Sequence, residues 1–170
     1  RHSRFPKTPL GAHADAERVT LADAHLNDAI LNGTNLQNAD LQRADLEGAD
    51  LSRASLGGTD LKDAVLTSAT LQGADLTGAD LRRANMVGAD LTGAVLRDAD
   101  LRGAILLDAK LEGATNLDLY RYIAGLLPTG QKQFLEAQRD FLDSLSLDEL
   151  ANFQLTPEKL AELREHADAV

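Results

Sequence analysis

Apolar positions recur every five residues along most of this chain. From residue 21 to residue 111 the central position of each unit is leucine eighteen times and methionine once, at Met86. The residue two positions earlier is alanine in sixteen of these nineteen units, and the exceptions are Val19, Thr34 and Thr59. A period of five fits neither the 3.6-residue period of an α-helix nor the two-residue alternation of a strand. The pattern therefore predicts a five-residue structural unit with two inward positions, which forms one side of a square coil.

The position two residues after each centre predicts a sharp corner. It is glycine in nine units and aspartate or asparagine in six, and these residue types accept a positive φ. In the four remaining units the sequence predicts a different kind of turn. These corners are Arg43, Arg53, Ser68 and Arg83.

Segments such as Ala49-Asp50-Leu51 and Ala79-Asp80-Leu81 follow an A(D/N)LXX pattern and resemble the pentapeptide repeat family. The resemblance implies an all-β solenoid, a right-handed quadrilateral β-helix in which the leucine and the alanine point inward. At four units per coil the repeats make about five coils, and a strand spacing of about 4.8 Å gives a rod of roughly 24 Å. The expected domains are an N-terminal extension and cap over 1–18, the β-helix over 19–115 and an α-helical tail over 116–170.

The tail changes to helical spacing of its apolar residues. Pro128 and Gly130 are expected to end a first helix, and Ser146 and Thr156 are expected N-caps of later ones. Short helices need a surface to pack on, which is the last coil, another tail helix or a second chain. The candidate contact residues are Phe134, Leu135, Phe141 and Leu142.

Residues 20 apart are expected to share one face of the rod. One such face holds a candidate acidic ladder, Asp40, Asp60, Asp80 and Asp100. Spaced at one coil each, these carboxylates either imitate the phosphates of a DNA duplex or form a solvated face. The second reading is favoured by a row of partners two residues along the chain. That row is Gln42, Lys62, Arg82 and Arg102.

A second face holds a candidate apolar docking patch, Val65, Val87, Ile105 and Leu107. Exposed apolar residues gathered in this way need a cover. The favoured interpretation is that the tail folds back over them, and the alternative is that they bind a second copy of the chain or another protein.

Charge and composition limit the chemistry. The formal net charge is −10, which argues against direct binding to nucleic acid or to anionic lipid. No cysteine is present, and the four histidines lie apart at His2, His13, His25 and His166, so no metal site, no cofactor and no catalytic constellation is expected. No apolar run is long enough to span a membrane.

These observations predict a non-enzymatic protein-interaction or scaffold module, with an unidentified protein partner and a homodimer through the tail as a further option. The resemblance implies one alternative, since some pentapeptide repeat proteins mimic DNA, bind DNA gyrase and confer quinolone resistance. A second alternative is a structural part of a larger chain, because the sequence begins at Arg1. The expected location is the bacterial cytoplasm, and a processed periplasmic or lumenal product stays open.

Overall fold

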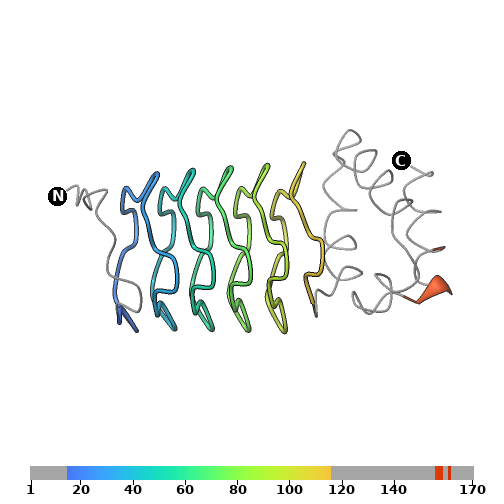
Figure 1. Ribbon diagram of the computed structural model, residues 1–170, viewed down its shortest axis with the longest axis horizontal. Coiled ribbons are helices and arrows are strands. Elements are labelled where there is room, and N and C mark those ends of the chain that lie inside the picture. Colours follow the sequence, from blue (N-terminus) through green and yellow to red (C-terminus); the bar gives the residue numbers. More distant parts are fainter. Residues whose placement is uncertain (1–14, 116–155, 159–160, 162–170) are drawn as a thin grey trace.

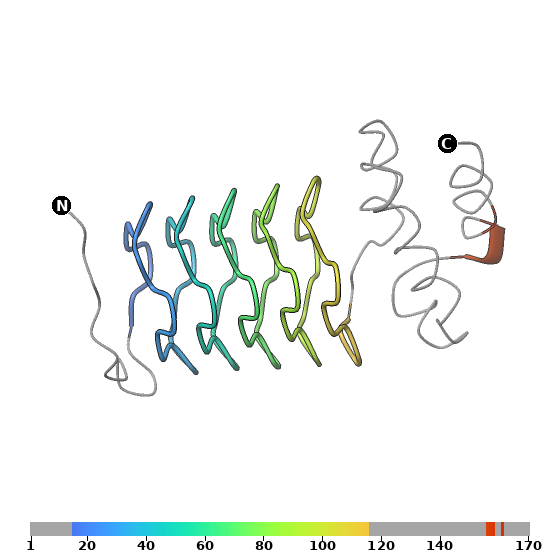
Figure 2. The same cartoon turned by 90° about the horizontal axis from the view of Figure 1, so that it is seen from above.

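The computed structural model describes residues 15–115 together with 156–158 and 161. Residues 15–115 form a rod of stacked coils that follow one another along the long axis, from the blue end to the yellow end in Figures 1 and 2. The first bridge starts at Asp15, four residues before the predicted start of the repeats. The chain therefore builds its coils in sequence order, each against its predecessor.

The coils are joined by parallel β-bridges between residues 20 apart. Each bridge involves single residues rather than a longer strand, and a new one begins every fifth residue from Asp15↔Asn35 to Val95↔Thr115. Four bridges per 20 residues give the coil four sides. Backbone bonds cross both ways at each side: the N–H of Leu41 donates to the carbonyl of Asp60 at 2.8 Å, and the N–H of Asp60 donates to that of Ala39 at 2.9 Å.

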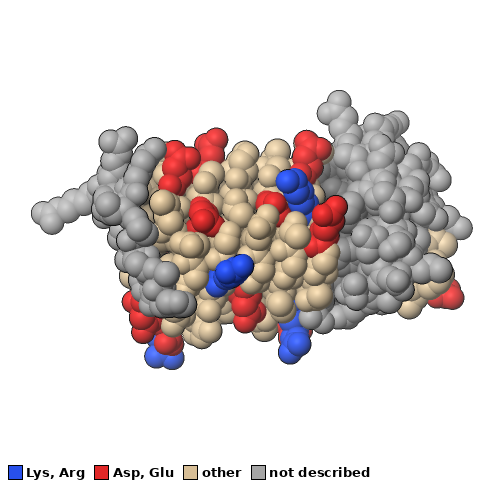
Figure 3. Space-filling view, viewed as in Figure 1, with Lys and Arg blue, Asp and Glu red and all other residues tan. Residues whose placement is uncertain are grey.

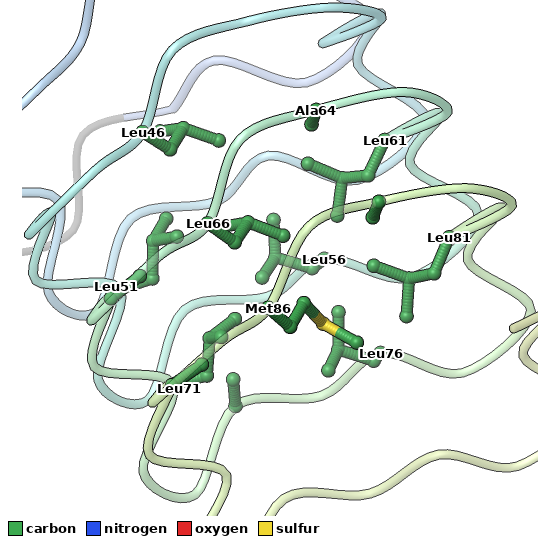
Figure 4. Packing of buried hydrophobic residues seen from close by; sticks show 14 of the residues in the cluster. Leu46, Leu51, Leu56, Leu61, Ala64, Leu66, Leu71, Leu76, Leu81 and Met86 are labelled. Carbon is green, nitrogen blue, oxygen red and sulfur yellow. The ribbon is translucent and has the colours of Figure 1, made fainter. Parts of the chain in front are cut away.

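Leucine and alanine fill the inside of the rod. The central leucines from Leu36 to Leu96 and Met86 among them are at most 1% exposed, and the alanines between them are buried with them. Figure 4 shows the centres stacked by coil, with Leu46, Leu66 and Met86 following one another on one side. The predicted two inward positions per unit are confirmed. Within the described coils, each inward side chain thus packs against the equivalent side chains of the neighbouring coils, 20 residues away.

Every corner uses the same backbone turn. The N–H of Ala44 donates to the carbonyl of Leu41 at 3.1 Å, which closes a four-residue turn, and the third residue, Arg43, has φ of 55°. The sequence-based prediction of a different turn was wrong for Arg43, Arg53, Ser68 and Arg83, since their φ values lie between 55° and 59°. The ladder on both sides fixes the corner, so a non-glycine residue accepts a left-handed conformation that costs roughly 1–2 kcal/mol.

The predicted caps lie largely outside the described residues. This applies to the N-terminal extension and to the tail contacts Phe134, Leu135, Phe141 and Leu142. In the tail, the backbone is helical at Pro157, Glu158 and Ala161, directly after Thr156. A hydrogen bond from its own backbone N–H lowers the pKa of the Glu158 carboxyl, and a hydrogen bond from the Thr156 side chain adds to this effect. This start agrees with the predicted N-cap, and the remaining tail helices stay a prediction.

Two threonines replace inward alanines and differ in one hydrogen bond. The Thr59 hydroxyl donates to the carbonyl of Leu36 at 2.7 Å, whereas the buried hydroxyl of Thr34 has no partner within the described coils. A buried unpaired hydroxyl costs about 1–3 kcal/mol, and an apolar group of the same shape removes that cost. Thr34→Val should therefore raise the free energy of unfolding by about 1 kcal/mol, and Thr59→Val should lower it by about 1 kcal/mol.

Urea unfolding followed by circular dichroism measures both changes. The two variants are matched, because each exchanges one hydroxyl for one methyl at a fully buried inward position. Equal shifts of the same sign would contradict the assignment of the two hydroxyls.

Candidate functional site

The residue before each centre has a structural task whenever it is aspartate or asparagine. Its side-chain oxygen accepts the backbone N–H of the residue two positions later, at 3.0 to 3.3 Å. All eleven such residues between 15 and 115 do this. They are Asp15, Asn35, Asp40, Asp45, Asp50, Asp60, Asp75, Asp80, Asn85, Asp90 and Asp100.

The backbone explains why an acceptor is needed there. In the unit from Asp40 to Ala44, the N–H groups of residues 40, 41 and 43 donate to neighbouring coils and that of residue 44 closes the turn. The fifth N–H, that of Gln42, donates to Asp40 Oδ1 at 3.1 Å. A backbone N–H without a partner destabilises the fold, so a short side chain with an acceptor oxygen at this position stabilises each unit. The candidate acidic ladder is thus first of all a row of turn-closing side chains.

The aspartate face consists of Asp40, Asp60, Asp80 and Asp100 with the row Gln42, Lys62, Arg82 and Arg102 beside it. Bridges place the four aspartates on one line. The predicted pairing is confirmed in the last two coils, where Arg82 Nε donates to Asp80 Oδ1 at 2.8 Å and Arg102 Nε donates to Asp100 Oδ1 at 2.9 Å.

These ion pairs reduce the negative charge that the aspartate face presents to a partner. The guanidinium of Arg82 hydrogen-bonds to Asp80 and lowers the pKa of that carboxyl, against the opposing effect of its burial. Four carboxylates stand beside three basic side chains, so the face has a net charge of −1. Figure 3 shows red and blue side chains interspersed with uncharged ones on the side of the rod that faces the viewer.

The charged edge is the corner column next to this face, Asp23, Arg43, Asp63 and Arg83. Its members alternate in sign and pair between coils: Arg43 Nε donates to Asp23 Oδ1 at 2.7 Å, and Arg83 Nε donates to Asp63 Oδ1 at 2.6 Å. Both carboxyls have a lowered pKa because of these bonds. Sequence reasoning missed this column, although the alternation of Asp and Arg at 20-residue spacing was visible in the sequence.

The apolar face holds the predicted docking patch. Bridges join Val65 to Asn85 and Asn85 to Ile105 in one row. Val87 and Leu107 lie in the neighbouring row, where the N–H of Gly88 donates to the carbonyl of Leu107 at 2.8 Å. Ile105 and Leu107 are 38% and 40% exposed, while Val65 and Val87 are half-buried. The structure therefore brings the four residues to one face, and polar Asn85 lies between Val65 and Ile105.

Net charge is unevenly divided among the four faces. Residues 15–115 contain seventeen acidic and nine basic residues, a net charge of −8. When each corner residue is counted with the side that precedes it, the apolar face has four acidic residues and no lysine or arginine. The other three faces have between −2 and −1 each. The acidic residues of the apolar face are Asp28, Asp45, Glu47 and Asp108.

Asp90 lies on a third face, and several neighbouring groups stabilise its carboxylate. A side-chain hydrogen bond from Thr92 is the main cause that lowers this pKa to about 2; further contributions come from Gln72, whose Nε2 donates to Asp90 Oδ2 at 2.8 Å, and from Lys110. The ordinary value is 3.8. Since the folded-state pKa lies below the unfolded one, the stabilisation is complete above about pH 5 and is lost as the pH falls towards 2.

Asp90→Asn should therefore flatten the acid limb of the stability curve. An amide oxygen at this position still accepts the N–H two residues later, as Asn85 does for Val87 at 3.3 Å. The difference in unfolding free energy between the original chain and the variant should shrink by at most about 2 kcal/mol between pH 6 and pH 2. Urea unfolding at several pH values measures it. A difference that does not change with pH would contradict the lowered pKa.

No group of three or more His, Cys, Asp or Glu side chains has the arrangement that holds a metal ion in residues 15–115, 156–158 and 161. No helix within those ranges has the length and hydropathy of a membrane span.

Comparison with known proteins decides the family. The sequence model described as pentapeptide repeats matches eight copies, over residues 12–48, 20–58, 44–83 and 79–115. Together these segments cover more than half of the 170 residues. The chain belongs to the pentapeptide repeat family. Its fold over the coils is accordingly the right-handed quadrilateral β-helix of that family, as the sequence predicted.

Several solved pentapeptide repeat structures are similar to this chain. Rfr23 of the cyanobacterium Cyanothece 51142 is 31% identical, with 59% of this chain and 82% of Rfr23 covered and a TM-score of 0.46. HetL of Nostoc sp. strain PCC 7120, described as involved in the regulation of heterocyst differentiation, is 35% identical, with 59% of each chain covered and a TM-score of 0.42. QnrB1, a plasmid-mediated fluoroquinolone resistance protein, is 16% identical, with 68% of this chain and 70% of QnrB1 covered and a TM-score of 0.32. No curated protein matches the sequence.

Proposed function

We propose that this pentapeptide repeat protein is a non-enzymatic protein-interaction or scaffold module, a rod of about five coils followed by a helical tail. The observation that carries the proposal is the exposure of Ile105 and Leu107 together on one face of the rod, whereas Ile30, which is 37% exposed, lies by itself on another face. Large apolar side chains that stay exposed together are typical of binding surfaces. Inward positions hold only packed side chains, which supports binding on the outside rather than chemistry within.

A second candidate function is DNA mimicry directed at gyrase. The overall charge of −10 and the line of four aspartates favour it. The basic row beside that line weighs against it, because Arg82 and Arg102 bind the last two carboxylates and leave a net charge of −1 on the face. Imitating a duplex needs a continuous acidic field. The interaction module is therefore the better-supported proposal.

Affinity capture from a bacterial lysate tests the interaction module. The full chain is compared with a variant in which Ile105→Thr and Leu107→Thr remove the exposed apolar side chains, and circular dichroism checks that the rod stays folded. We expect one or more proteins to be held by the full chain and lost from the variant. A rod that enriches no protein above the background of an empty support would contradict a binding role.

A supercoiling assay separates the gyrase alternative from the interaction module. DNA mimicry requires that a molar excess of the chain inhibits or protects gyrase, and that Asp60→Lys with Asp80→Lys abolishes the effect. If gyrase ignores the chain, DNA mimicry is excluded and the interaction module is unaffected.

A further inference from the structure

We infer that the apolar face binds a basic amphipathic helix of a partner protein, with apolar residues of that helix on Ile105 and Leu107 and its lysines or arginines beside the acidic residues. This inference rests on the proposed interaction function and assigns it a surface and a partner chemistry. It follows from the coincidence, on one face, of the exposed apolar side chains and of four acidic residues with no lysine or arginine, among which Asp45 Oδ2 lies 3.9 Å from His25 Nδ1.

The acidic residues flank the apolar ones. Asp45 is bridged directly to Val65, so it lies one coil before the apolar residues. Glu47 occupies the neighbouring row, where the N–H of Gly48 donates to the carbonyl of Thr67 at 2.9 Å. At the other end, Asp108 follows Leu107 at the corner. A ligand that covers Leu107 and Val65 thus passes within reach of carboxylates at both ends of the patch.

The spacing of the rows suits a helix that lies along the rod. Successive coils are about 4.8 Å apart, and one turn of an α-helix rises 5.4 Å, so each helical turn meets about one coil. Residues at i, i+3, i+4 and i+7 of such a helix would face the two rows through Val65, Ile105, Val87 and Leu107. Positively charged residues at the two ends of that stripe would lie beside Glu47 and Asp108.

Charge argues against two other occupants. Residues 116–170 contain ten acidic and five basic residues, a net charge of −5, and a second copy of the chain has a net charge of −10. Either would place like charges on a face that has four acidic residues and no lysine or arginine. Like charges in an interface oppose binding. A partner with basic residues meets no such penalty.

Thiol labelling tests whether the face is open in the complete protein. The chain has no cysteine, so Leu107→Cys gives a single reactive thiol, and Thr77→Cys places the control on the opposite side of the rod. In the full 170-residue chain we expect the two thiols to react with a water-soluble disulfide reagent at rates within about tenfold of each other. A cysteine at 107 that reacts only after unfolding would show that the chain covers its own face, and the inference would be overturned.

Peptide binding tests the partner chemistry. The probe is a synthetic amphipathic helix of about 18 residues with a leucine stripe flanked by lysines, and its matched control has glutamate in place of lysine. Fluorescence anisotropy should show the lysine peptide binding to the full chain at least about tenfold more tightly than the glutamate peptide, with a dependence on salt. Equal binding of both peptides would overturn the inference.

Neutral variants locate the binding. Asp45→Asn with Glu47→Gln removes two charges while Asn keeps the turn acceptor, and Asp75→Asn with Asp98→Asn removes two charges from the opposite side. We expect the first pair of substitutions to weaken the binding of the lysine peptide several-fold, and the second pair to leave this binding unchanged. Likewise Ile105→Thr with Leu107→Thr should weaken it more than Val95→Thr. Equal effects on the two sides would overturn the assignment of this face.

The interaction function and the partner chemistry are tested separately by these experiments. If the lysate capture succeeds but the peptide does not distinguish the faces, the interaction function stands and the partner chemistry is wrong. If neither the lysate nor the peptide yields binding, both are wrong.

Discussion

Leu66→Ala is expected to lower the free energy of unfolding by about 3 to 5 kcal/mol. Leu66 is 0% exposed and stacks between Leu46 and Met86 in the middle of the rod (Figure 4). Its N–H donates to Asn85 at 2.7 Å, and the N–H of Leu46 donates to Val65 at 2.8 Å. Because these ladder bonds hold the coils at a fixed spacing, the neighbours cannot close the cavity, and the loss falls at the upper end for such a substitution. Urea unfolding followed by circular dichroism measures it.

The matched control is Leu66→Met. Met86 already occupies the next coil in the same stack and is fully buried, so a thioether of similar volume fits this column. Leu66→Met should lower the free energy of unfolding by less than about 1.5 kcal/mol. A loss below about 1 kcal/mol for Leu66→Ala would show that the coils do relax around the cavity.

Gly58→Ala is expected to lower the free energy of unfolding by about 1 to 2 kcal/mol, through two separate effects. Its φ of +66° is a conformation in which a side chain costs roughly 1–2 kcal/mol. A Cβ there would also come within 2.5 Å of Oδ1 of Asn38, the corner residue of the preceding coil. Asn38 must therefore move away from its position, and this adds to the conformational cost.

Gly78 supplies the comparison for Gly58. It has a φ of +68°, and a Cβ added to it would meet no atom within 4 Å. Gly78→Ala should cost only the conformational part, about 1 kcal/mol. In the background Asn38→Gly, the cost of Gly58→Ala should fall to the same value, since the oxygen is gone. Equal costs for the two glycines in the original chain would refute a contribution from Asn38.

The five-residue register could be predicted from the sequence because burial selects it directly. Any other alignment of Leu66 or Ala64 would expose them, and both are fully buried. Four units per coil make residues 20 apart share a face, and this rule correctly predicted that Val65 and Ile105 lie in one bridged row. Their function as a docking surface is a proposal that neither the sequence nor the fold tests.

The corners at Arg43 and Arg53 were predicted wrongly because residue preference was given more weight than the ladder. A turn whose two ends are tied to neighbouring coils imposes its φ on whatever residue lies there. The task of residues such as Asp40 was also missed. Its bond to the N–H of Gln42 becomes evident only when the partners of the other four N–H groups of the unit are known.

The 20-residue coil gives insertions and deletions unequal consequences. Duplicating residues 41–60 would return every later residue to its own face, so the surface would be lengthened and otherwise kept. Removing one five-residue unit would still stack leucines of neighbouring coils on one another inside the rod. Outside, it would rotate everything downstream by a quarter turn, and Ile105 would move to the face that now holds Asp100. Gain or loss of a whole five-residue unit can thus leave folding unchanged and yet alter which surface a partner meets.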